Sequence, residues 1–295
     1  FWKAVNKGAE QAADEFGAKI TFVGPQNETA IAEQLEQLNN AINKNPNAIA
    51  LAALDTQSEL DAIKQAQAKN IPLIGFDSGV PGAPDGAIKA TASTDNYAAG
   101  ANAAEHLFPL LEKKLGDKPV RIGVVSQEAN SLSITQRTSG FIDKMAELLE
   151  KKGIKTAVVG HDKFKNNVSE SDAKAIIEVR VPAQVDDAAG KTEASTVLEK
   201  ADTIAIYGSN EFAAKAIINA NGSFKESKLG ADKILAVGFD SGALQQDAIR
   251  NGIFVGSVTQ DPIQIGYQAV KLAIEAAQGK EVKDVDTGSK WYDAK

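Results

Sequence analysis

The sequence predicts an α/β fold of two similar lobes, each a doubly wound parallel sheet. Apolar strand-like runs alternate with amphipathic helical segments along the whole chain, an order typical of parallel sheets. One hexapeptide occurs twice, as IGFDSG at residues 74–79 and VGFDSG at residues 237–242, each time after a short apolar run. The 295 residues also suffice for two lobes of about 150 residues each.

The repeated hexapeptide ends a predicted buried strand on an acid, Asp77 in the first copy and Asp240 in the second. Ligands of open parallel sheets bind at the carboxyl ends of the strands. The pattern therefore predicts that each lobe offers one carboxylate to a shared cleft. Either aspartate could instead cap the following helix or tighten a turn. The duplicated context favours ligand contact.

Periodicity predicts the elements of the first lobe in order. Val5, Ala9, Ala12 and Phe16 recur at helical spacing, and Gly17 follows as a stop. The further expected elements are a strand at 20–23, a helix at 29–42, a strand buried on both faces at 48–54, a helix at 58–70, the strand of the first hexapeptide, a strand at 87–92 and a long helix at 97–114.

The second lobe repeats this scheme. We expect strands at 120–125, 156–159, 203–207, 234–239 and 254–258, helices at 134–152, 193–200, 211–220 and 263–277, and a last strand near Trp291. Residues 161–190 show little periodicity and are interpreted as partly helical. We place the first lobe at residues 1–93 and 261–285, and the second at residues 94–260 and 286–295.

Composition narrows the function. A net charge of -7 argues against binding nucleic acid through a basic surface. The chain has no cysteine and two histidines, and its acidic residues do not follow a calcium loop, so we expect no metal and no cofactor. No glycine-rich phosphate loop and no GxSxG motif occurs, so we do not expect an enzyme.

Several short motifs follow one another in a characteristic order. They are Phe1-Trp2 at the start of a helix, Phe76-Asp77, ASTDN at residues 92–96, RTSGF at residues 137–141, Ser209-Asn210-Glu211, VGFD at residues 237–240 and Gln260-Asp261-Pro262. Over essentially the whole chain, this series resembles the ribose/galactose type of periplasmic sugar-binding proteins, which feed ABC importers. The resemblance implies the type I periplasmic binding protein fold, with two lobes that are joined by three hinge segments and close on a sugar.

The resemblance also implies site residues. Phe1 and Trp2 match aromatics that contact the sugar ring, and Asp77 and Arg137 match an acid and an arginine that bind hydroxyls. The polar set of the second lobe is matched by Asn210, Asp240 and Gln260.

Asp55 joins the candidates through the internal repeat, because residues 48–55 parallel residues 203–210. Other roles stay open: Arg137 could form a surface ion pair, Asn210 could cap a helix, and Phe1 and Trp2 could belong to a frayed terminus.

The sequence departs from the family pattern at several places. The family has a strand before the Phe1-Trp2 pair, and we expect this first strand to be absent from the chain. Ser78 stands where ribose binders carry an arginine, 185–187 (VDD) stands where they carry an aromatic, and residues 161–180 look like an insertion. These departures disfavour ribose and leave another monosaccharide.

The resemblance therefore implies a solute-binding protein that captures a monosaccharide in the cleft between the lobes. It would deliver the sugar, as a monomer, to the membrane subunits of an ABC importer. The expected location is the periplasm, or the outer face of a Gram-positive cell with a lipid anchor, after removal of an export signal. The alternative is the ligand-binding core of a lactose-repressor-type regulator, or a sugar or autoinducer-2 sensor. A regulator of that type needs a helix-turn-helix before the first lobe, and the chain shows none.

Overall fold

The computed structural model describes residues 1–27, 30–55 and 57–295, which fold into two compact units. The first unit is Phe1–Asp95 with Asp261–Gly288, and the second is Asn96–Gln260 with Ser289–Lys295. In each unit helices cover both faces of a sheet whose neighbouring strands are mainly parallel, which confirms the predicted α/β class. None of the helices in the described ranges is long and apolar enough to cross a membrane.

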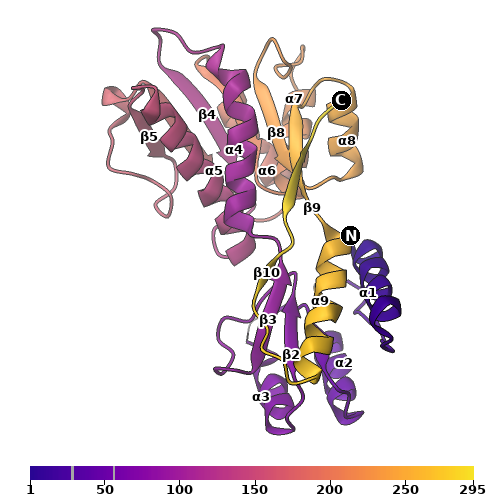
Figure 1. Ribbon diagram of the computed structural model, residues 1–295. Helices are drawn as coiled ribbons and strands as arrows, with labels where there is room; N and C mark the ends of the chain where they lie inside the picture. The colour runs from indigo at the N-terminus through magenta and orange to yellow at the C-terminus, as the bar shows by residue number, and fades with distance from the viewer. Residues whose placement is uncertain (28–29, 56) are drawn as a thin grey trace. The chain divides into compact units, whose positions relative to one another are not determined.

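The first unit is built on a parallel sheet. Its strands follow the order β1 (Ile49–Leu51), β2 (Leu73–Phe76), β3 (Ile88–Ser93) and β10 (Val285–Asp286). Successive residues of β2 pack on opposite faces, Leu73 against α2 (Ile31–Asn43) and α3 (Leu60–Ala68), and Ile74 against α9 (Pro262–Ala277). Helix α1 (Trp2–Phe16) packs on α9 (Figure 1).

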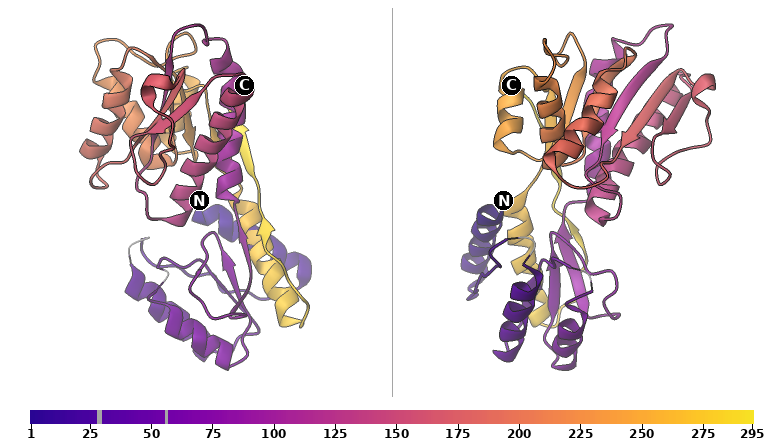
Figure 2. Two further views of the ribbon diagram at one scale, coloured as in Figure 1. Left: turned by 90° about the vertical axis from the view of Figure 1, so that its left-hand side faces the viewer. Right: turned by 180° about the vertical axis from the view of Figure 1, so that it is seen from behind.

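The second unit is built on a larger sheet. Its strands follow the order β11 (Ser289–Tyr292), β9 (Gly256–Gln260), β8 (Leu235–Phe239), β7 (Thr203–Gly208), β4 (Val120–Val125), β6 (Ala175–Arg180) and β5 (Thr156–Val159). All neighbours are parallel except β11, which runs antiparallel to β9. Helices α4 (Asn96–Glu112) and α5 (Leu132–Lys151) cover one face (Figure 1). Helices α6 (Asp187–Leu198), α7 (Glu211–Gly222) and α8 (Ala243–Arg250) lie on the other side, as the view from behind shows (Figure 2).

The predicted strand at residues 20–23 is wrong. This segment has no secondary structure, and Ile20, Phe22 and Val23 are exposed. A strand requires a backbone partner, and none of the described strands pairs with these residues. The start of the helix predicted at 29–42 falls on Thr29, which lies outside the described residues.

Residues 161–190 are partly helical as predicted, but the prediction missed a strand in this segment. The segment contains a 3-10 turn at Glu170–Asp172 and then β6, which lies between β4 and β5 inside the sheet. Glu178 and Arg180 interrupt the apolar pattern of β6, which hides the strand from a periodicity argument. Glu178 is nonetheless buried, because Arg121 and Lys200 hold its carboxylate at 2.5 and 2.6 Å.

Two further boundaries differ from expectation. Strand β1 spans only Ile49–Leu51, and Ala50 is exposed, so the strand is not buried on both faces. Helix α6 begins at Asp187, six residues before the predicted start, because the Asp186 carboxylate caps it by accepting a hydrogen bond from the backbone N–H of Ala189 (2.7 Å).

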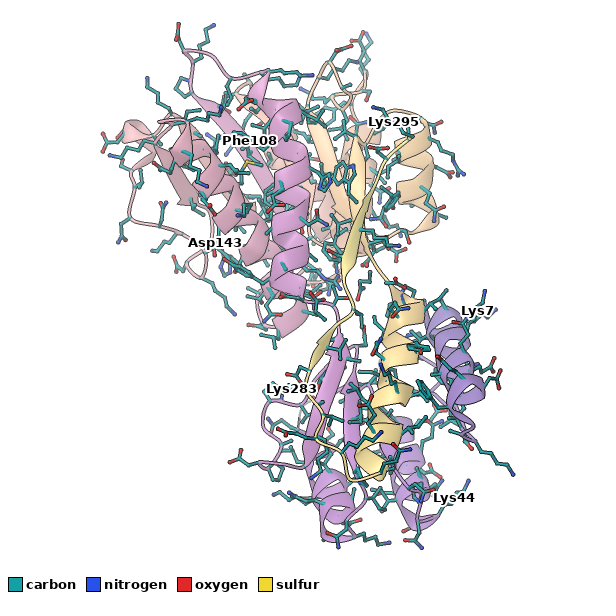
Figure 3. All side chains as sticks on the ribbon, in the orientation of Figure 1. Lys7, Lys44, Phe108, Asp143, Lys283 and Lys295 are labelled. Atoms are coloured by element: carbon teal, nitrogen blue, oxygen red, sulfur yellow. The ribbon has the colours of Figure 1, made fainter. Side chains whose placement is uncertain are left out.

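Helices α4 and α5 approach each other at backbone distance. A Cβ added to Gly100 would lie 2.2 Å from the carbonyl oxygen of Arg137, and one added to Gly140 would lie 2.0 Å from that of Tyr97. The Tyr97 hydroxyl, from α4, also donates to the carboxylate of Asp143, which is labelled on α5 in Figure 3 (2.6 Å). The two glycines thus allow a contact that any larger side chain would prevent.

Replacing Gly140 by alanine is expected to lower the free energy of unfolding by about 1–3 kcal/mol, because the new methyl group forces the two helices apart. Urea unfolding followed by circular dichroism measures this change. Gly222→Ala, at the end of α7, is the matched control, since nothing lies within 4 Å of the added Cβ. Equal stability of the two variants would contradict the close helix contact.

Candidate functional site

Strand β8 ends at Phe239, and the backbone of the next residue, Asp240, turns into the left-handed region (φ 77°). Aspartate is one of the few non-glycine residues that adopt this conformation readily. The backbone N–H of Asp240 donates to the carbonyl oxygen of Val258 on the neighbouring strand β9 (2.7 Å). The turn places the Asp240 carboxylate at the carboxyl end of the sheet.

Arg137 and Gln260 meet the Asp240 carboxylate from different elements. The Arg137 Nη1, on α5, donates to Oδ2 at 3.4 Å, and the Gln260 Nε2, at the end of β9, donates to Oδ1 at 3.1 Å. Three side chains predicted for the site from sequence motifs therefore converge on one ion pair.

Two further residues hold the guanidinium of Arg137. The Asn96 Oδ1 accepts a hydrogen bond from the Arg137 Nε at 2.9 Å, and the guanidinium carbon lies 4.1 Å from the centre of the Phe239 ring. The Arg137 side chain is only 8% exposed, so its charge depends on these neighbours. A guanidinium has five N–H donors, more than these two hydrogen bonds use. The group of Arg137, Asp240 and Gln260 carries no net charge.

Asn210, two residues after β7, has the capping role that the sequence left open for it. Its Oδ1 accepts from the backbone N–H of Ala213 (2.9 Å) and so caps α7. Its Nδ2 donates to the Gln127 Oε1 (2.8 Å), beyond the end of β4. The cap fixes the orientation of the amide, so Asn210 presents only N–H donors away from the helix.

In the first unit, Asp77 repeats the geometry of Asp240. Its backbone is left-handed (φ 61°), and its N–H donates to the carbonyl oxygen of Ala92 (3.0 Å). The Trp2 ring meets Phe76, the residue before Asp77, edge-on at 6.3 Å between ring centroids, and Phe1 meets Trp2 at 4.8 Å. The predicted aromatic pair thus lies beside the strand end that carries the predicted acid.

Asp55 follows β1 and shapes the turn before α3. Its Oδ2 accepts hydrogen bonds from the backbone N–H of Ser58 (2.8 Å) and from the Ser58 hydroxyl. Nearby Glu59 is fully buried, and neither of its carboxylate oxygens has a hydrogen-bond partner among the described residues. Burial, with a smaller contribution from the charge of Asp55, raises the pKa of Glu59 to about 7.

Sequence reasoning missed the residues that hold the predicted ones. Asn96 entered the sequence analysis only as the last residue of the ASTDN motif, and Gln127 and Glu59 were not considered. Gln127 could have been found, because it follows a buried strand as Asp77 and Asp240 do. Within the described ranges, no group of three or more histidine, aspartate or glutamate residues could hold a metal ion.

Comparison with known proteins identifies a family. Residues 1–281 match the family model described as periplasmic binding protein domain. The D-allose-binding periplasmic protein of Escherichia coli is 25% identical over 97% of this chain and 83% of its own length. The ribose import binding protein of Haemophilus influenzae is 25% identical over 96% of this chain and 83% of its own length.

Solved structures agree with this assignment. A protein from Brachyspira murdochii, described as an ABC transporter and LacI family transcriptional regulator, has 39% identity and a TM-score of 0.84, over 99% of this chain and 90% of that one. An ABC transporter solute-binding protein from Agrobacterium vitis with bound D-fucose has 28% identity and a TM-score of 0.71, over the same shares of the two chains.

The raised pKa of Glu59 predicts a pH dependence of stability. The unfolded chain loses this proton near pH 4.5, but the folded chain holds it until about pH 7. Stability from this group is therefore present below pH 4.5 and is lost as the pH rises to 7, by on the order of 2–3 kcal/mol.

Glu59→Gln should remove this part of the pH dependence. The measurement is the difference in unfolding free energy between pH 5 and pH 8, by urea unfolding of wild type and variant. Asp61→Asn, on the first turn of α3, is the control and should keep the wild-type difference. If Glu59→Gln kept the wild-type difference, folding would not raise the pKa of Glu59.

Proposed function

Because the chain belongs to the periplasmic binding protein domain family, we propose that it is a solute-binding protein that captures a monosaccharide and delivers it to an ABC importer. The observation that carries this proposal is the group of Arg137, Asp240 and Gln260. A sugar hydroxyl both donates and accepts hydrogen bonds, and this group offers a carboxylate acceptor beside guanidinium and amide donors. Its zero net charge suits an uncharged ligand.

We propose that each unit contributes residues that contact sugar. Asp240, Arg137 and Gln260 would bind adjacent hydroxyls, and Asn210 would donate to a further sugar oxygen. From the first unit, Asp77 would accept hydroxyl protons, and Phe1 and Trp2 would cover the C–H face of the ring. Asp55 would contribute mainly through the turn that it holds, because its Oδ2 already accepts two hydrogen bonds from Ser58.

Similar proteins narrow the class of sugar. They include binders named for D-allose and ribose and a solute-binding protein that holds D-fucose. We propose an aldose of this size. We further propose that the protein binds it without turnover, as an exported monomer, and takes up neither cofactor nor nucleic acid.

A second candidate is the ligand-binding core of a transcription regulator. The description of the Brachyspira murdochii protein, which names both an ABC transporter and a LacI family regulator, favours this candidate. The two functions separate in one experiment. A binding protein should stimulate sugar-dependent ATP hydrolysis by its importer in liposomes, whereas a regulator should not.

Titration calorimetry tests the proposed ligand class. Wild type should bind one of D-allose, D-ribose, D-fucose and D-arabinose at micromolar or lower concentration. Asp240→Ala should weaken that binding at least about 100-fold, because the buried guanidinium of Arg137 loses its carboxylate partner as well as its sugar contact.

Asp202→Ala is the matched control, since Asp202 is the partner of another arginine in the second unit (Arg121, 3.0 Å). It should bind the sugar as wild type does, even where its stability falls. Failure of wild type to bind any of the four sugars would contradict the proposed ligand class. An equal loss in both variants would show that Asp240 acts only through stability.

A further inference from the structure

The last strand of the second unit, β11, brings a tyrosine to the backbone of Asp240. Tyr292 lies directly opposite Ser257 in the antiparallel pair of β11 and β9. The hydroxyls of Tyr292 and Ser257 both donate to the carbonyl oxygen of Asp240, each at 2.8 Å. Neither contact involves the Asp240 side chain, which faces Arg137 and Gln260.

The position of β11 is fixed by its neighbours. The Trp291 ring packs on Gly256, where an added Cβ would lie 2.0 Å from a ring atom. On its own side of the sheet, Trp291 also stacks with the His106 ring of α4 at 4.9 Å and an interplanar angle of 8°. The Asn102 amide of α4 donates to the Ser289 hydroxyl at 3.3 Å. A strand held in this way can act as a rigid support for Tyr292.

We infer that Tyr292 is a positioning residue for Asp240: its hydroxyl holds the Asp240 backbone so that the carboxylate meets Arg137 and Gln260. This inference rests on the proposed function, because it assigns Tyr292 a role in the affinity for the sugar. Tyr292 would act through the backbone of Asp240, to which its hydroxyl donates.

The backbone of Asp240 is held on both sides of its Cα. Rotation about the N–Cα bond of Asp240 would move its carbonyl and its side chain together, because the Cα carries both. A carbonyl that accepts hydrogen bonds from two hydroxyls cannot rotate without breaking both of them. The N–H on the other side is tied to Val258, so both peptides of Asp240 are held.

Comparison with Asp77 distinguishes the effect of Tyr292 from the effect of the local sequence. Asp77 has the same left-handed backbone (φ 61°) in the first copy of the hexapeptide. The local sequence therefore favours the conformation itself. The contribution of Tyr292 is to keep the Asp240 carboxylate within hydrogen-bonding distance of Arg137. Loss of the Tyr292 hydroxyl should lower the affinity for the sugar without unfolding the unit.

The test compares Tyr292→Phe, which removes only the hydroxyl, with Tyr267→Phe, which removes a hydroxyl that donates to Glu15 in the first unit. Calorimetry with the sugar that wild type binds should show about five- to tenfold weaker binding for Tyr292→Phe. Tyr267→Phe should bind this sugar with the affinity of wild type. In the background of Asp240→Asn, Tyr292→Phe should have no further effect, because its influence passes through the Asp240 carboxylate.

Two results would overturn the inference: unchanged affinity in Tyr292→Phe, or the same loss in the Asp240→Asn background. If wild type binds none of the sugars, the proposed function fails, and NMR of the ligand-free protein decides the inference alone. The Arg137 Nε–Hε and Asp240 amide resonances should then shift in Tyr292→Phe and stay in place in Tyr267→Phe. Unshifted resonances in both variants would refute the positioning role.

Discussion

The buried guanidinium of Arg137 is the constraint on which the group of Arg137, Asp240 and Gln260 depends. A charge removed from water is tolerated only where protein groups replace the water, and here Asn96, Asp240 and Phe239 do so. These partners come from α4 and from the end of β8, so Arg137 can reach them only if α5 lies against α4. The glycines of the two helices permit that approach, since the carbonyl oxygen of Arg137 lies where a side chain at Gly100 would stand. The close packing of α4 on α5 is therefore a condition for burying the charge of Arg137.

Much of the fold and of the site could be predicted because their signals are local. A buried run that ends in an acid and a glycine marks a strand end, and the two hexapeptides mark it twice. Asp240 and Arg137 were expected at the site, and the structure joins them in an ion pair. The contacts between individual side chains were not expected, because they connect distant positions: Asn96 and Arg137 are 41 residues apart, and Arg137 and Asp240 are 103 apart. No pattern within a short window records such a pair.

The wrongly predicted strand at residues 20–23 and the missed strand β6 have the same physical origin. Residues 20–23 have the composition of a strand but none of the described strands pairs with them, whereas β6 contains Glu178 and Arg180 and yet lies inside the sheet. Strand formation depends on partners that are distant in sequence, and strand preference reflects the surroundings as much as the residue. Burial of Glu178 becomes acceptable only once Arg121 and Lys200 are placed around it, and they belong to other elements.

The second unit contains two buried arginines, and their ion pairs differ in geometry. Arg121 lies 2.5 Å from Glu178 and 3.0 Å from Asp202, and Lys200 contacts the same Glu178 oxygen, so these charges satisfy one another at short range. Arg137 meets Asp240 at 3.4 Å, and the exposed fraction of the Asp240 side chain is 25%. A buried ion pair adds little stability compared with apolar packing, so a loosely engaged one is hard to explain by folding alone. The looser pair holds its charges in place and leaves hydrogen-bonding capacity, which is the property that our proposal assigns to sugar binding.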